Sequence, residues 1–176
     1  MARNVEIKAR AADPHRMRAL AEGLADGPAE VLVQDDTFYC APKGRLKLRC
    51  TASGRAELIA YERPDDSGPK SCEYHVCPVF RPAELKPVLA QALGVRGRVR
   101  KERHLYHCGR TRIHLDRVEN LGEFVELEVV LGDGESEEDG RREALGIMAR
   151  LGLGDHDVVS GAYIDLLEEA KASAGN

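Results

Sequence analysis

The chain has 176 residues, of which 43% are hydrophobic, and this length and composition predict a single compact domain over residues 1–176. Its formal net charge of -4 argues against a general nucleic-acid binder and against a protein that binds anionic membranes. The first residues lack the apolar core of a signal peptide, and no apolar stretch is long enough to span a bilayer, so a cytoplasmic protein is expected.

Cysteine and histidine spacing gives no metal signature. The five cysteines are an odd number and include no CxxC pair, so reduced thiols are expected. Among the six histidines, His104 and His107 stand three apart, which places them on opposite faces of a strand. We therefore predict no metal-binding role for the histidines.

Short runs of alternating apolar and polar residues, separated by Gly, Pro, Asp or Ser, dominate the chain and predict strands. In chain order, the predicted strands cover residues 3–10, 29–41, 45–52, 55–63, 70–78, 98–108, 111–118 and 123–131. Helix start and stop signals predict four helices over residues 14–24, 82–93, 136–151 and 160–172. The first begins after Asp13, the second ends at Gly94, and the last two begin at Ser136 and Ser160.

Several predicted strands carry charged side chains on one face and apolar ones on the other. In the last strand, Glu126 and Glu128 point to the same side, opposite Val125 and Leu127. The same alternation groups Asn4, Glu6, Lys8 and Arg10; Arg45, Lys47 and Arg49; Lys101 and Arg103; and Arg112, His114 and Asp116.

Two interpretations of these charged faces remain open from the pattern. They are the solvated outer faces of a sheet, as in most antiparallel sheets, or they line the inside of a closed barrel. The amphipathic helices favour the barrel, because they must bury their apolar stripes against the apolar face of the same sheet. The predicted fold class is therefore α+β: a closed antiparallel eight-stranded β-barrel with helices packed outside.

A polar barrel interior needs compensating charges, because buried charge must be paired or neutralised. A bound polyanion and a divalent cation meet this need together. Carboxylates suit Mg²⁺ or Mn²⁺, and lysine and arginine suit phosphate oxygens. The predicted metal ligands are Glu6, Asp116, Glu126 and Glu128, and the predicted phosphate-binding residues are Lys8, Lys47, Arg49, Lys101 and Arg103.

Four sequence motifs on these strands resemble those of the CYTH family of triphosphate-tunnel metalloenzymes, over nearly the whole chain. NVEIK at residues 4–8 resembles the family's ExExK strand, with Asn4 in place of the first glutamate. LKLR at 46–49 and VRKERHLY at 99–106 resemble its basic strands, and HLDRVENLGEFVELEV at 114–129 resembles its aspartate and paired glutamates. Because Asn4 lacks a negative charge, a two-metal mechanism is placed in doubt.

The resemblance adds further predictions. The hairpin at 61–74 resembles one that would supply Arg63 and Lys70 as substrate-binding residues, and SGAYIDLL at 160–167 resembles the segment that opens the family's last helix. Glu6 and Lys8 are predicted to be catalytic. The implied partner is a small-molecule triphosphate, with no nucleic acid or membrane, bound by a monomer or homodimer.

The resemblance implies a metal-dependent enzyme without fixing its reaction. A class IV adenylate cyclase-like activity, which converts ATP to cyclic AMP and pyrophosphate, is the leading hypothesis. A triphosphatase acting on thiamine triphosphate or inorganic triphosphate is the first alternative, and a non-catalytic module that binds polyphosphate or nucleotides is the second.

Overall fold

The computed structural model describes residues 2–62 and 68–174. Its eight strands are β1 (Ala2–Arg10), β2 (Glu30–Tyr39), β3 (Arg45–Thr51), β4 (Ala56–Glu62), β5 (Lys70–Pro78), β6 (Val95–Cys108), β7 (Thr111–Val118) and β8 (Gly122–Leu131). Its helices are α1 (Pro14–Leu24), α2 (Pro82–Leu93), α3 (Glu137–Arg150) and α4 (Tyr163–Ala174), with a short 3-10 turn, η1, at Asp155–Asp157. Arg63, a predicted substrate-binding residue, lies outside the described residues.

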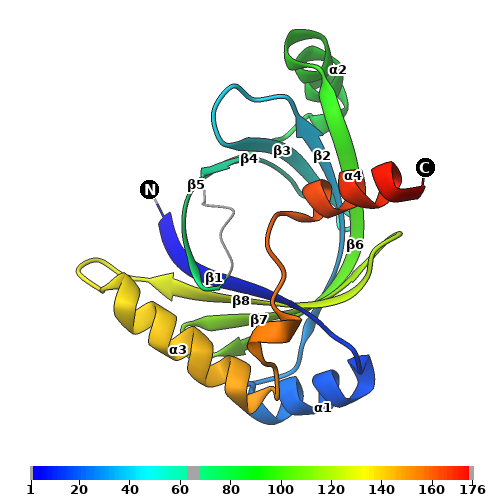
Figure 1. The fold of residues 1–176 in the computed structure, drawn as a ribbon. Helices are drawn as coiled ribbons and strands as arrows, with labels where there is room; N and C mark the ends of the chain where they lie inside the picture. The colour runs from blue at the N-terminus through cyan, green and yellow to red at the C-terminus, as the bar shows by residue number, and fades with distance from the viewer. Residues whose placement is uncertain (1, 63–67, 175–176) are drawn as a thin grey trace.

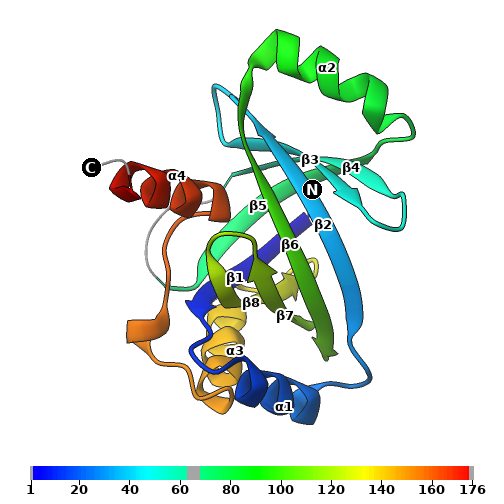
Figure 2. The same cartoon turned by 90° about the vertical axis from the view of Figure 1, so that its right-hand side faces the viewer.

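The eight strands close into one antiparallel barrel in the order β1-β5-β4-β3-β2-β6-β7-β8. Figure 1 looks into this barrel, and Figure 2 shows the long strands β2 and β6 side by side along its wall. The closing pair is β1 with β8, in which Glu6 lies opposite Glu128 and Lys8 opposite Glu126. The predicted fold class is confirmed.

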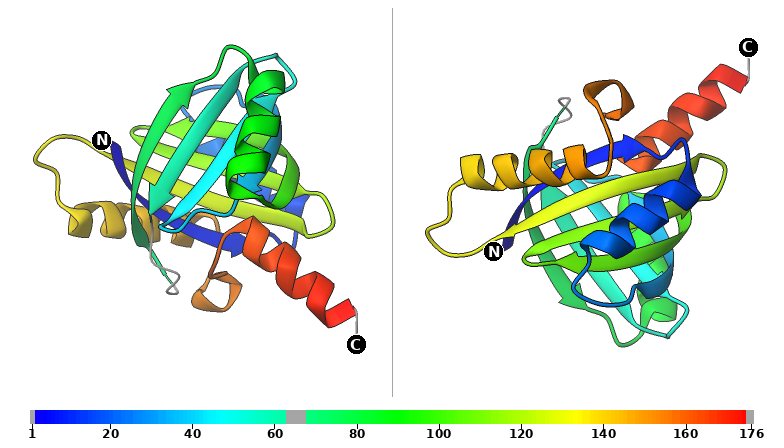
Figure 3. Two further views of the ribbon diagram at one scale, coloured as in Figure 1. Left: turned by 90° about the horizontal axis from the view of Figure 1, so that it is seen from above. Right: turned by 90° about the horizontal axis from the view of Figure 1, so that it is seen from below.

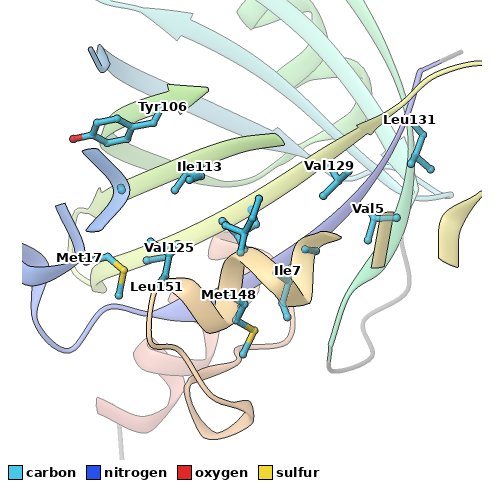
Figure 4. Close-up of a cluster of buried hydrophobic side chains, with 14 residues drawn as sticks. Val5, Ile7, Met17, Tyr106, Ile113, Val125, Val129, Leu131, Met148 and Leu151 are labelled. Atoms are coloured by element: carbon cyan, nitrogen blue, oxygen red, sulfur yellow. The ribbon is translucent and has the colours of Figure 1, made fainter. Parts of the chain in front are cut away.

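The main apolar core lies outside the barrel wall, under α1 and α3. Val5 and Ile7 of β1 and Val125 and Leu127 of β8 point outward into it, because side chains alternate along a strand. Helix α3 contacts β1 and β8, and α1 contacts β6 and β7, so the two helices cover the lower outside of the barrel (Figure 3, right). Figure 4 shows the resulting cluster, in which Met148 of α3 packs among these strand residues.

Consequently, the charged faces of the strands turn inward. Of the two interpretations of the charged faces, the barrel interior is therefore correct, because the helices occupy the apolar side of the sheet. None of the five cysteines forms a disulfide within residues 2–62 and 68–174. No helix among residues 2–62 and 68–174 is both long and apolar enough to cross a membrane.

Two predicted boundaries are wrong by three residues. The sixth strand begins at Val95 instead of residue 98, because Gly94 ends α2 with a φ of 76° and the chain continues directly into β6. The last helix begins at Tyr163 instead of Ser160. Gly161 adopts a φ of 81° between them, and the Asp165 carboxylate accepts a hydrogen bond from the Ala162 amide, 2.6 Å away, at the true helix start.

Candidate functional site

The inward-facing side chains enclose a cavity of about 370 Å³, called here the barrel cavity. Charged and polar groups line most of it: Asn4, Glu6, Lys8, Asp36, Lys47, Arg49, Glu57, Lys101, Arg103, Arg112, Glu126 and Glu128. Apart from Arg63, Lys70 and Asp116, this set contains every residue predicted from sequence to bind metal or substrate. The structure thus brings together side chains from distant parts of the chain.

One wall of the cavity is built around Asp36 of β2. Its carboxylate accepts two hydrogen bonds of 2.8 Å from the Arg49 guanidinium and one of 2.9 Å from Lys47 Nζ. Burial alone would raise the pKa of Asp36, but the charges of Arg49 and Lys47 outweigh burial and hold that pKa well below its usual range. The two cations are therefore positioned by a buried, ionised carboxylate.

A second cluster is built around Asp116 of β7, which is fully buried and lies two strands from β2 in the barrel order. Lys101 Nζ lies 3.0 Å from this carboxylate, two Arg103 nitrogens lie 2.6 Å from it, and the Tyr163 hydroxyl donates to it at 2.9 Å. Burial opposes ionisation of Asp116, and the charges of Arg103 and Lys101 prevail, so its pKa lies below the ordinary value. Both carboxylate oxygens of this predicted metal ligand thus hold cations in the described structure.

Glu126 connects this cluster to the first strand. Arg103 donates to Glu126 at 2.7 Å, and Lys8 Nζ lies 3.7 Å from its other oxygen. Burial acts against ionisation of Glu126, but the charges of Lys8 and Arg103 hold its pKa well below the usual value. Glu126 is therefore a carboxylate at neutral pH.

Glu6 and Lys70 are also placed at the site. Glu6 lines the barrel cavity, and its register positions it between Glu128 of β8 and Lys70 of β5. Lys70 is buried on the inward-facing side of β5, two residues before Cys72, which lines the cavity. Lys70, predicted from the hairpin to bind substrate, thus lies beside Glu6, a predicted metal ligand.

Three side chains form a group that could hold a metal ion: His114, Glu126 and Glu128, whose ligand atoms lie within 4.8 Å of one another. His114 Nδ1 is 3.7 Å from a Glu126 oxygen and 3.8 Å from a Glu128 oxygen. Burial, together with the charge of Arg103, lowers the pKa of His114, which favours the neutral imidazole that binds metals.

Asn4 occupies the position where the ExExK motif has its first glutamate. It is buried, it lines the barrel cavity, and its side-chain oxygen has no hydrogen-bond partner among residues 2–62 and 68–174. A buried carbonyl without a partner is costly, so this oxygen is available to a ligand that enters the cavity.

An apolar wall on β4 and β5 faces the charged groups. Ile59 lies opposite Val76, and Tyr61 lies opposite Tyr74, in the antiparallel register of these strands. All four side chains line the cavity. Val76 is 45% exposed, so this wall reaches the solvent-accessible mouth. Composition alone did not reveal this wall, since aromatic residues make up only 5% of the chain.

The C-terminal segment fills part of the barrel interior. The start of α4 lies over the interior in Figure 1, and Tyr163 packs against Phe124 in an edge-to-face contact with ring centroids 5.1 Å apart. Lys8 Nζ lies 4.1 Å from the Tyr163 ring centre and donates a hydrogen bond of 3.3 Å to the Gly161 carbonyl. Arg45 and Arg96 anchor the same segment through Asp165, at 2.9 and 2.6 Å.

Sequence reasoning missed Asp36, the apolar wall and the closeness of His114 to Glu126 and Glu128. Asp35 and Asp36 are adjacent, so they point to opposite faces of β2, and the pattern alone does not say which one is inside. His114 shares a face with Asp116, but the spacing of histidines along the sequence does not indicate that it lies near Glu126 and Glu128.

An eight-stranded antiparallel barrel with cations and carboxylates facing one another inside it defines a protein of the triphosphate-tunnel class. The model of the CYTH domain matches residues 2–163, and the chain therefore belongs to the CYTH domain family. The resemblance found in the motifs is confirmed.

Solved structures share this barrel. A protein from Pyrococcus horikoshii superposes with a TM-score of 0.80 at 24% identity, covering 93% of this chain and 98% of its own. A candidate adenylate cyclase from Vibrio parahaemolyticus superposes with a TM-score of 0.80 at 18% identity, covering 94% of this chain and 97% of its own. A candidate adenylyl cyclase from Hippeastrum with a dominant triphosphatase activity superposes with a TM-score of 0.64 at 16% identity, covering 90% of this chain and 91% of its own. No curated protein matches the chain. At these identities the likenesses show the fold alone.

Proposed function

We propose that this protein is a divalent-metal-dependent enzyme that processes an organic triphosphate inside the barrel cavity. The observation that carries the proposal is the convergence of five buried or half-buried cations, from three strands, on one cavity: Lys8, Lys47, Arg49, Lys101 and Arg103. A linear triphosphate offers acceptor oxygens along its length, and lysine and arginine donate charge-assisted hydrogen bonds to such oxygens.

The cations are already paired with carboxylates. This pairing positions the cations but leaves some of their hydrogen-bond donors unused. Arg49 uses two donors on Asp36, and a guanidinium has five. Lys47 and Lys101 each have three donors on an ammonium group. The remaining donors are available to phosphate oxygens, while Asp36 and Asp116 hold the side chains in place.

The donor set also fits a divalent metal. Glu126 and Glu128 point into the cavity from one strand, with Glu6 in register beside Glu128, and oxygen ligands of this kind suit Mg²⁺ or Mn²⁺. When bound, the metal supplies positive charge that neutralises phosphate oxygens. Around it, Lys8 and Glu6 act as the proposed catalytic pair, since Lys8 neutralises phosphate charge and Glu6 orients the attacking group.

The organic group of the substrate is proposed to lie against the apolar wall of Ile59, Tyr61, Tyr74 and Val76. This wall favours an organic triphosphate over inorganic triphosphate, which has no apolar surface to bury. The leading reaction is cyclisation of ATP, in which the ribose 3'-hydroxyl attacks the α-phosphorus and pyrophosphate leaves. The second is hydrolysis, in which water attacks the terminal phosphorus; the dominant triphosphatase activity of the Hippeastrum protein, which has a similar fold, favours testing it equally.

Turnover with three substrates tests the proposal. The purified protein is incubated with ATP, thiamine triphosphate or tripolyphosphate, with Mg²⁺ or Mn²⁺, and products are separated by chromatography while phosphate is assayed. Cyclic AMP with pyrophosphate identifies a cyclase, and orthophosphate identifies a triphosphatase. Absence of all products, with retained binding of tripolyphosphate, would instead identify a binding module.

A further inference from the structure

His114 lies on the inward-facing side of β7, on the same strand face as Arg112 and Asp116. The residue is 2% exposed, yet its Nδ1 atom has no hydrogen-bond partner among residues 2–62 and 68–174. A buried polar atom without a partner is unfavourable, and a bound ligand or ion is one way in which a native structure satisfies it.

The surroundings of this nitrogen indicate which ligand. Nδ1 lies 3.7 Å from Glu126 and 3.8 Å from Glu128, too far for a hydrogen bond to either carboxylate. Two ligand atoms that bind one ion at about 2.1 Å are separated by about 3.0–3.6 Å for bond angles of 90–120°. The two Nδ1 distances are slightly longer than this range, and all three ligand atoms lie within 4.8 Å of one another. A small shift of these side chains would therefore let all three bind one ion.

We propose that His114 Nδ1 is a metal ligand together with Glu126 and Glu128, so that the site has a mixed nitrogen and oxygen donor set. Carboxylates alone suit both Mg²⁺ and Mn²⁺, whereas an imidazole nitrogen binds first-row transition ions more readily than it binds Mg²⁺. The metal preference of this chain is accordingly shifted toward Mn²⁺ or Zn²⁺ and away from Mg²⁺. This inference rests on the proposed function for the presence of a metal, and it adds the ligand and the ion.

The substitution of Asn4 for a glutamate is consistent with the same shift. Losing a carboxylate from the cavity removes negative charge, which weakens the site most for Mg²⁺, a hard cation that depends on oxygen ligands. A nitrogen ligand at His114 retains affinity for softer ions without that charge. Asn4 on β1 and His114 on β7 thus both shift the preference of the site away from Mg²⁺.

Pulsed EPR of Mn²⁺ bound to the full chain tests the ligand directly, because a coordinated imidazole nitrogen couples magnetically to the ion. We expect ¹⁴N coupling in the unmodified protein and its loss in His114→Ala. We also expect the Kd for Mn²⁺ to rise about tenfold or more in this variant, since even outer-shell changes cost 10–100-fold. The Kd for Mg²⁺, measured by competition, should change less.

His75→Ala is the matched control, since His75 is an exposed histidine of the same barrel, on β5, and should leave the coupling and both Kd values unchanged. Bound Mn²⁺ without nitrogen coupling in the unmodified protein would overturn this inference and leave the proposed function intact. No Mn²⁺ binding, even with tripolyphosphate present, would overturn both. The spectrum of the unmodified chain decides the matter even if His114→Ala does not fold.

Discussion

Asp36→Asn should destabilise the ligand-free protein strongly and make its stability depend on a bound polyanion. Asp36 is 2% exposed and holds Lys47 and Arg49 through three hydrogen bonds of 2.8–2.9 Å. Removing one partner of a buried ion pair costs about 3–5 kcal/mol, because the other charges stay buried without compensation. For a domain of this size, about 2–4 °C of Tm corresponds to 1 kcal/mol, so the expected loss is about 10 °C.

Tripolyphosphate should reverse much of this loss, since its oxygens replace the missing carboxylate beside Lys47 and Arg49. Differential scanning fluorimetry with and without the ligand measures both effects, and the ligand-induced rise in Tm should be larger in the variant than in the unmodified protein. Asp35→Asn is the matched control: Asp35 is the adjacent residue, faces outward and pairs with the half-exposed Arg98. A surface pair contributes only about 0–1 kcal/mol.

Equal losses of Tm in the two variants would refute the reasoning, because the buried and surface pairs would then be equivalent. An identical ligand-induced rise in Asp36→Asn and the unmodified protein would refute the assignment of Lys47 and Arg49 to phosphate binding. In that case, the Asp36 cluster would be a structural ion pair only.

Three further predictions concern the cations, the metal and the first strand. Burial, with the charge of Arg103, lowers the pKa of Lys101 to about 7, so the free amine predominates above that pH, whereas a bound polyanion favours the ammonium. Affinity for tripolyphosphate, measured by calorimetry, should therefore fall from pH 7 to pH 9, and this pH dependence should be weaker in Lys101→Arg. An equal pH dependence in both proteins would contradict the assignment of Lys101 to phosphate binding. The double variant Glu126→Gln/Glu128→Gln should remain folded by circular dichroism but lose metal-dependent turnover, and an unchanged rate would exclude these residues as ligands. Asn4→Glu should tighten Mn²⁺ binding in an EPR titration, and an unaltered Kd would show that Asn4 does not occupy the missing ligand position.

The barrel itself was predictable because its pattern is redundant. Alternation in β8 separates Val125 and Leu127 from Glu126 and Glu128, and the same two-sided pattern recurs on other strands. Helices that need an apolar partner then decide which face is outside. The start of the last helix was less predictable: Ser160 is a good capping residue, but the Asp165 carboxylate and Gly161 fix the start of α4 three residues later.

The candidate site was predictable where residue type and strand face coincide, as for Lys8, Lys47 and Arg103. Partners across the cavity were not, because they depend on barrel closure and on side-chain reach. Asp36 belongs to β2, whose charged residues gave no clear face, and Tyr163 reaches Asp116 from a helix 47 residues later in the sequence. Such contacts depend on tertiary packing that strand periodicity does not encode.

The measurement that tests the central claim most directly is a calorimetric series with orthophosphate, pyrophosphate and tripolyphosphate, at fixed pH and Mn²⁺ concentration. Cations from three strands that converge on one cavity predict that affinity rises with each added phosphate and is greatest for tripolyphosphate, with one ligand bound per chain. Equal or undetectable affinities across the series would contradict the account, because the cavity would then not recognise a triphosphate.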